Sequence, residues 1–263
     1  QERWSHWSDP VQFEVTSPET GKYVEALRIT EIHYHPKEAN LAEQEQGWST
    51  SDFEYIELQN VSGSDLDLTN LRLTKGVDFD FETGTIIRSK EYLLVVRNRA
   101  AFESRFGAGL PIAGEWQKGN RLDNGGENLK LSYGAGIPII EFTYDDADPW
   151  PEGPDGNGFS LNLEEPEKSQ NHGNVGSWYS GSASPGSVGV KVESPLLLTV
   201  LEDPFSFEFN SVKGNTYHIE VSDDLSKWTS KEKIVAKGSK TLHEPILNIG
   251  EKVKFFRVRQ GSN

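Results

Sequence analysis

Apolar and polar residues alternate with a period of two through much of this sequence. The clearest runs are residues 53–58 (FEYIEL), 66–68 and 71–73, and comparable runs recur toward the C-terminus. Successive side chains of a β-strand point to opposite faces of a sheet, so this alternation predicts strands that bury one face and expose the other. We therefore expect the chain to fold into antiparallel sheets.

The remaining sequence patterns predict further strands and only two short helical stretches. Residues 128–133 and 137–144 flank a glycine pair and predict a hairpin, and residues 92–97 form an apolar run of strand length. Helical spacing is confined to residues 99–106 and to a weaker turn at residues 41–46. The sequence thus predicts an all-β protein.

Charge divides the 263 residues into two unequal parts. Residues 1–189 carry 15 basic and 31 acidic side chains, a net of −16, whereas residues 190–263 carry 11 and 10, a net of +1. A stretch rich in glycine and serine, residues 176–189, lies between them and has the composition of a loop followed by a flexible connector. We predict a domain boundary near Gly189.

The two ends of the chain complete the predicted organisation. Residues 190–263 contain further strand patterns at 196–201, 205–209, 216–221 and 254–259, which predict a second, smaller β-sandwich. Residues 1–24 form either an exposed arm or the last strand of a preceding fibronectin-type module. The chain begins at Gln1 and contains no methionine, so we expect a longer translation product. The predicted units are thus 1–24, 25–189 and 190–263.

Six motifs follow one another between Leu27 and Gly189 in an order that resembles the lamin tail domain, in its bacterial extracellular form. They are LRITEIHYHP at 27–36, DFEYIELQNVSG at 52–63, DLTNLRL at 67–73, EYLLVVR at 91–97, LDNGGENLKL at 122–131 and WPEGPDGNGFSL at 150–161. The resemblance implies an immunoglobulin-like β-sandwich. Residues 190–263 are similar to fibronectin-like modules at the C-termini of large exported bacterial proteins.

The resemblance implies a fold more firmly than a function, because one sandwich fold carries many unrelated activities. Bacterial members of the family sit in multidomain secreted proteins, where they are thought to anchor or bind. We therefore expect a non-catalytic binding or structural module of a larger secreted or cell-surface protein, with an unidentified extracellular glycan or protein as its partner. The alternative is a carbohydrate-binding or anchoring region of a polysaccharide-degrading or phosphoryl-transfer enzyme whose catalytic domain lies upstream.

Acidic side chains gather in residues 141–165, which hold eight Asp and Glu residues and neither Lys nor Arg. Calcium takes six to eight oxygen ligands from loop carboxylates, amides and carbonyls. Four of these acidic side chains and one amide lie in stretches that contain Pro and Gly residues and are candidate calcium ligands: Asp145, Asp146, Asp148, Asp155 and Asn157. The alternative is a solvated acidic loop in which Asp and Gly serve turn geometry.

Two further groups of residues suggest ligands. Glu31, His33 and His35 share one face of a predicted strand and offer either a transition-metal site or ordinary half-exposed strand positions. Tryptophans predicted in loops could instead stack on sugar rings or pack in the core. The candidates for stacking are Trp48, Trp116 and Trp178.

Several function classes are disfavoured. The formal net charge of −15 opposes binding to nucleic acid and to anionic membranes, and no apolar run approaches the roughly 18 residues that span a bilayer. The sequence lacks cysteine and contains no GxSxG, P-loop, HExxH or GxGxxG motif. We therefore expect a protein that is not an enzyme. A hydrolase that uses loop carboxylates is the least favoured alternative.

Overall fold

The computed structural model of the protein describes residues 19–191, 198–202, 205–211, 215–224, 226–238, 240–244 and 255–260. The predicted arm at residues 1–24 lies mostly outside these ranges. Its described end forms a short helix, α1 (Gly21–Ala26), which the sequence patterns did not predict.

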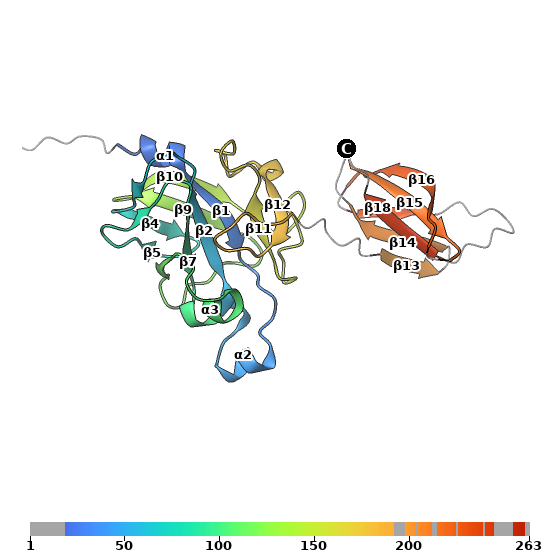
Figure 1. Ribbon diagram of the computed structural model, residues 1–263, viewed down its shortest axis with the longest axis horizontal. Coiled ribbons are helices and arrows are strands. Elements are labelled where there is room, and N and C mark those ends of the chain that lie inside the picture. The colour runs from blue at the N-terminus through green and yellow to red at the C-terminus, as the bar shows by residue number, and fades with distance from the viewer. Residues whose placement is uncertain are drawn as a thin grey trace, which may run out of the picture.

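Two large sheets and one small sheet form the first unit (Figure 1). The six-stranded sheet has the order β12-β11-β1-β2-β7-β8, with β1 (Leu27–His33), β2 (Tyr55–Asn60), β7 (Tyr92–Val96), β8 (Ile112–Glu115), β11 (Phe159–Leu163) and β12 (Trp178–Ser182). The four-stranded sheet has the order β10-β9-β4-β5, with β4 (Leu71–Lys75), β5 (Phe79–Asp80), β9 (Asn128–Tyr133) and β10 (Ile137–Thr143). A small two-stranded sheet pairs β3 (Leu66–Asp67) with β6 (Ile86–Ile87).

Apolar side chains from both large sheets share one buried core. Ile29 and Ile56 contribute from the six-stranded sheet, and Leu73 and Leu131 contribute from the four-stranded sheet. This is the sandwich that the period-two alternation predicts, because each strand sends every second side chain into the core. The fold class is confirmed: an all-β, immunoglobulin-like β-sandwich followed by a second β unit.

The predicted local elements agree with the structure. Strands β9 and β10 pair as an antiparallel hairpin. Helix α3 (Arg99–Phe106) covers the residues with helical spacing, and Asn98 caps it by accepting a hydrogen bond from the Ala101 backbone N–H. Helix α2 (Leu41–Glu45) and the 3₁₀ turns η1 (Thr50–Phe53) and η2 (Val175–Ser177) complete the helical elements of the described residues.

The six-stranded sheet departs from expectation in two ways. Strand β8 runs parallel to β7, because α3 crosses over between them, and the sheet is therefore not wholly antiparallel. All seven residues of β1 are buried, so this strand is not exposed on one face as predicted. A bulge between Ile29 and Glu31 also shifts the register of β1 against β2.

Helix α3 explains part of this burial. Its Phe102 packs with Tyr55 of β2 and Leu94 of β7 on the face of the six-stranded sheet that points away from the main core. A sheet covered on both faces has no solvent side, and its polar residues must find partners within the protein. This condition applies to the glutamates described below.

The second unit consists of two three-stranded sheets. One contains β13 (Leu198–Glu202), β14 (Phe205–Asn210) and β17 (Lys240–His243), and the other contains β16 (Thr229–Val235), β15 (Thr216–Ser222) and β18 (Phe255–Gln260). The buried residues of its core are Phe207, Phe209, Tyr217, Ile219 and Ala236. The sequence patterns predicted β13, β14, β15 and β18 but not β16 and β17. Among the described residues of the whole chain, no helix has the length and apolar character required to cross a bilayer.

Candidate functional site

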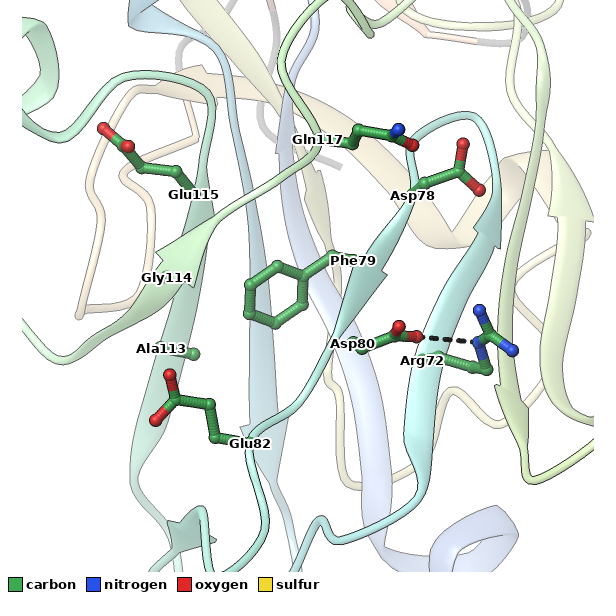
Figure 2. A pocket seen from close by; sticks show the side chains of 9 residues that line it. All are labelled: Arg72, Asp78, Phe79, Asp80, Glu82, Ala113, Gly114, Glu115 and Gln117. Carbon is green, nitrogen blue, oxygen red and sulfur yellow. Dashed lines mark ion pairs between the residues drawn. The ribbon is translucent and has the colours of Figure 1, made fainter.

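A cavity of about 660 Å³ opens between strands β5 and β8 of the first unit (Figure 2). Its lining residues come from β4 and β5, from the turn around them and from β8: Arg72, Asp78, Phe79, Asp80, Glu82, Ala113, Gly114, Glu115 and Gln117. We call this cavity the β5–β8 groove. Strand β5 is the last strand of one sheet and β8 is the last of the other. The groove therefore lies where both sheets of the sandwich end.

The Phe79 ring forms the centre of the groove, as Figure 2 shows. It packs edge-on against Phe81 with ring centroids 4.9 Å apart. Gly114 leaves room for it, because a Cβ at that position would lie 2.7 Å from Phe79 Cε2. The close approach of β8 to the ring thus requires glycine at position 114.

Acidic side chains dominate the charge of the groove. The lining contains four acidic residues, Asp78, Asp80, Glu82 and Glu115, and one cationic residue, Arg72, which gives it four negative charges and one positive. The Arg72 Nε lies 2.8 Å from Asp80 Oδ1, and both side chains are largely exposed. An exposed ion pair of this kind contributes little to stability. The groove is consequently a negatively charged surface suited to a cationic ligand.

The sequence contains a signal for this groove outside the motifs described above. In residues 77–82 (VDFDFE), acidic residues alternate with apolar ones, so a strand there presents its carboxylates together on one face. No comparable pattern indicates that β8 lines the groove, because its residues Ala113 and Gly114 are small and uncharged.

A second polar feature lies on the outer face of the six-stranded sheet. Glu31 of β1 and Glu57 of β2 are register partners, and each side chain is 1% exposed. Glu31 Oε1 accepts hydrogen bonds from Tyr55 Oη at 2.7 Å and from the Ser160 hydroxyl, whereas Glu31 Oε2 has no partner among the described residues. Thr30 Oγ1 donates to Glu57 Oε1 at 2.7 Å. Two carboxyl groups are thus enclosed beside each other.

Residues 183–189 cover this pair, and we call them the strap. The Ser184 backbone N–H donates to Glu31 Oε1 at 3.0 Å, and the Gly186 backbone N–H donates to Glu57 Oε2 at 2.6 Å. Beyond the strap, the Ser182 N–H donates to the Val190 carbonyl at 3.1 Å. The sequence predicted a flexible connector in this glycine- and serine-rich stretch. That prediction is corrected: residues 178–182 form β12, and the strap is bonded to the sheet.

Burial sets the protonation of the pair. Desolvation raises the pKa of Glu31 to about 7, although its hydrogen bonds act in the opposite direction. Desolvation and the neighbouring charge of Glu31 raise the pKa of Glu57 to about 8. Glu54, which accepts from the Leu122 backbone N–H at 2.9 Å, is also desolvated, and its pKa rises to about 8. Burial thus favours the protonated form of these three carboxyls, compared with an exposed glutamate.

The residues of the expected calcium site lie in the segment that joins β10 to β11. Asp145 Oδ1 accepts from the Ala147 backbone N–H at 3.0 Å, and Asp155 pairs with the His35 ring. Asp148 is exposed, and Asn157 Nδ2 donates to the Asp155 carbonyl at 3.0 Å. The contacts of Asp145 and Asn157 lie within this segment, and the contact of Asp155 reaches His35, which follows β1.

Three of these carboxylates lie close enough to influence one another and Tyr34. Desolvation and a hydrogen bond with Asp145 raise the pKa of Asp146. Tyr34 is fully buried, its hydroxyl has no hydrogen-bond partner among the described residues, and desolvation with the charges of Asp155, Asp146 and Asp145 raises its pKa. Even so, the described residues contain no group of three or more acidic or histidine side chains arranged to hold a metal ion. Calcium binding stays a prediction.

The suggested transition-metal face is not assembled. Glu31 and His33 end on the buried outer face of β1, where His33 packs beside Tyr55 with centroids 5.1 Å apart. His35 follows the strand and pairs instead with Asp155. The bulge in β1 and the end of the strand at His33 break the regular alternation that would align the three residues.

Two of the three candidate stacking tryptophans are in the core. Trp116 is 3% exposed and donates its indole N–H to the Asn120 carbonyl at 3.0 Å. Trp178, which begins β12 and does not lie in a loop, is 5% exposed and donates to the His172 carbonyl at 2.8 Å. Trp48 is half-buried and packs edge-on against Phe53. Both of these indoles are part of the buried core, so neither offers a ring face on which a sugar could stack.

Comparison with known proteins gives one match, which lies within the first unit. No curated protein and no solved structure gave a significant match to the chain. One family model, described as the Lamin Tail Domain, matches residues 22–146. The matched region includes the whole lining of the β5–β8 groove as well as Glu31 and Glu57, and it ends before β11. Residues 22–146 therefore carry the lamin tail domain pattern on an immunoglobulin-like β-sandwich, followed in the chain by a second β unit.

Proposed function

We propose that the chain is a non-catalytic binding module of a larger secreted or cell-surface bacterial protein, and that it holds a positively charged partner in the β5–β8 groove. The observation that supports this proposal is the groove itself: a cavity of about 660 Å³ whose lining carries four carboxylates and one guanidinium. The fibronectin-like character of residues 190–263 belongs to the same proposal.

The groove suits binding because rigid elements position its charged groups. The Asn120 Nδ2 donates to Asp78 Oδ2 at 3.1 Å, and Glu115 Oε1 accepts from the Arg99 backbone N–H at 2.5 Å. These contacts leave the remaining lone pairs of both carboxylates open to a cation. Binding of this kind is electrostatic and weakens with salt, since the Debye length is roughly 8 Å at physiological ionic strength.

A charge-neutralising variant tests the proposal. Glu82→Gln combined with Glu115→Gln removes two of the groove's negative charges without changing side-chain size. Hexalysine is the probe, and its dissociation constant is measured by fluorescence anisotropy at two salt concentrations. We expect the variant to bind at least tenfold more weakly than the native protein.

The matched control removes the same charge elsewhere. Glu45→Gln combined with Glu152→Gln alters two exposed side chains outside the groove, so the net charge falls equally. Equal weakening in both double variants would mean that hexalysine responds only to net charge, and the groove would lose its support as a site.

Calcium stabilisation of the loops after β10 and before β11 is a separate proposal. It is supported by the mutual influence of Asp145, Asp146 and Asp155, whose negative charges a bound cation would offset. Scanning calorimetry with millimolar calcium or with chelator tests it. A higher melting temperature in calcium that disappears in Asp146→Asn supports the proposal, and equal melting temperatures contradict it.

A further inference from the structure

The outer edge of β8 is an unpaired sheet edge within the groove. Strand β8 pairs with β7 on one side only, and no strand of the described residues pairs with its other side. The backbone groups of Ile112 are already bonded, since its N–H donates to the Leu110 carbonyl at 2.9 Å and its carbonyl accepts from Arg99 Nη2 at 3.3 Å, so the open positions of the edge lie within residues 113–115. Alternate residues of an edge strand direct their N–H and C=O groups outward, where an added chain can bond to them. The four residues of β8 extend over roughly 13 Å, since a strand rises about 3.3 Å per residue.

The side chains of β8 leave this edge accessible. Ala113 and Gly114 are small and only half-buried, and Glu115 is exposed. Natural edge strands are commonly protected by lysine, proline or a covering segment. None of the four residues of β8 is lysine or proline.

Strand β5, on the opposite side of the groove, is a poorer template. It has only two residues, Phe79 and Asp80. The carbonyl of the preceding residue, Asp78, already accepts a hydrogen bond from the Gln117 backbone N–H at 2.9 Å. An incoming chain therefore finds a longer edge on β8, with the half-buried Phe79 ring between the two strands, as Figure 2 shows.

We propose that the occupant of the β5–β8 groove is an extended peptide segment rich in lysine or arginine, which adds to the six-stranded sheet along the free edge of β8. This inference rests on the proposed function and specifies the partner. Main-chain hydrogen bonds to β8 supply the pairing, and the carboxylates of the lining select the cationic side chains.

The spacing of the charges supports an extended partner. Carboxylates lie on both sides of the Phe79 ring: Glu82 and Glu115 are on the side of β8, and Asp78 and Asp80 are on the side of β5 (Figure 2). Side chains two residues apart on a strand lie on the same face, roughly 7 Å apart. A segment with basic residues at alternate positions presents a row of cations toward the carboxylates on one side of the ring, while its remaining side chains face the other side.

Probes of equal charge separate strand addition from simple attraction of cations. The first is the peptide Lys-Thr-Lys-Val-Lys-Thr-Lys with blocked ends. The second is the same peptide N-methylated at its threonine and valine residues, which keeps the charge but removes the N–H donors of alternate residues. The third is spermine, a tetracation without a peptide backbone. Dissociation constants and hydrogen exchange of the β8 amides are measured for the full chain with each probe.

We expect the unmodified peptide to bind at least tenfold more tightly than spermine and to slow exchange of amides within residues 113–115. Because methylation at one set of alternate positions blocks only one pairing edge of the peptide, a peptide methylated at its lysines is measured as well, and at least one methylated form must lose tenfold in affinity. Equal affinity for all three peptides, without protection of β8, would overturn strand addition while leaving the cation-binding function intact. Failure of every cationic probe to bind would instead contradict the proposed function and this inference together.

Discussion

Glu31 and Glu57 lie opposite each other on neighbouring strands, both almost fully buried, and each carboxyl accepts a backbone N–H from the strap. A pair of glutamates in this position is costly when both are ionised, since neither charge is solvated and the two repel. The phenolic groups that face the pair, Tyr55, Tyr92 and Tyr179, all have raised pKa values and stay neutral through the physiological range. The pair therefore couples the stability of the sheet to pH.

Raising the pH from 5 to 9 should destabilise the protein. The folded pKa values of Glu31 and Glu57, about 7 and about 8, lie above the ordinary value of 4.5. The folded state then binds more protons than the unfolded state across this window, and the free energy of unfolding falls as pH rises through the folded pKa values. Urea denaturation at intervals of pH measures how the free energy of unfolding changes with pH. In Glu57→Gln, the loss of this free energy between pH 5 and 9 should be smaller than in the native protein by about 1 to 3 kcal/mol.

Glu91→Gln is the matched control, because the same change is made at an exposed position. A native protein whose stability is flat or rises between pH 5 and 9, or a Glu57→Gln variant with an unchanged slope, would contradict the account of the buried pair.

The strap should loosen when Gly186 is replaced by alanine. Gly186 has a φ of +83°, and a Cβ there would lie 3.1 Å from Leu110 Cδ2. Gly84 has almost the same φ, +82°, but a Cβ there meets nothing within 4 Å. Both variants carry the backbone strain, about 1 to 2 kcal/mol, whereas only Gly186→Ala displaces the strap. Faster hydrogen exchange at the amides of 184 and 186 in Gly186→Ala alone is the expected result, and identical exchange in the two variants would be evidence against a fixed strap.

Arg28 should be among the most sensitive positions of the first unit. Its buried guanidinium donates to the carbonyls of Val24, Glu25 and Leu27 at the end of α1 and to the carbonyl of Pro166. Arg28→Met leaves these carbonyls without their donor, at a cost of at least about 3 kcal/mol in the free energy of unfolding. Arg88→Met, at an exposed position, should cost less than about 0.5 kcal/mol. Chemical denaturation compares the two, and a similar small loss in both would contradict the role of Arg28.

His172 should act as a neutral hydrogen-bond acceptor. Its Nε2 accepts from the Ile29 backbone N–H at 3.0 Å, and desolvation with the nearby charge of Arg28 lowers its pKa to about 4. His172→Phe preserves a ring against Phe142 but leaves the buried N–H without an acceptor, a loss of about 1 to 3 kcal/mol. His172→Gln retains an acceptor and should lose less. The idea fails if denaturation ranks the two variants in the reverse order.

Local sequence patterns predicted much of the fold, because strand and helix formation depend on neighbouring residues. The alternation at residues 53–58 identified β2, and the spacing at residues 99–106 identified α3. The same alternation led to a wrong expectation for the polar face of β2. Burial of Glu57 depends on the strap, which is more than a hundred residues away in the chain, and no local pattern encodes that contact.

The candidate site was harder to predict for a related reason. The acidic alternation around Phe79 is visible in residues 77–82, but the groove also needs β8, whose Ala113 and Gly114 carry no chemical signal. Conversely, the acidic run at residues 141–165 is easily seen in the sequence, yet several of its members already have partners. Glu141, Glu164 and Glu165 pair with lysines, and Asp155 pairs with His35. Charge density alone did not distinguish a lined cavity from a loop that satisfies its own polar groups.

The most direct test of the central claim is a map of backbone amide chemical shifts, recorded by two-dimensional NMR while the lysine–threonine–valine peptide is added to the full chain. The account predicts concentrated, saturable shifts at Ile112–Glu115 and at Phe79 and Asp80, which are suppressed in the double variant Glu82→Gln, Glu115→Gln. Shifts centred on other surfaces, such as the acidic loops at residues 145–157, or no saturable shifts at millimolar peptide, would contradict it.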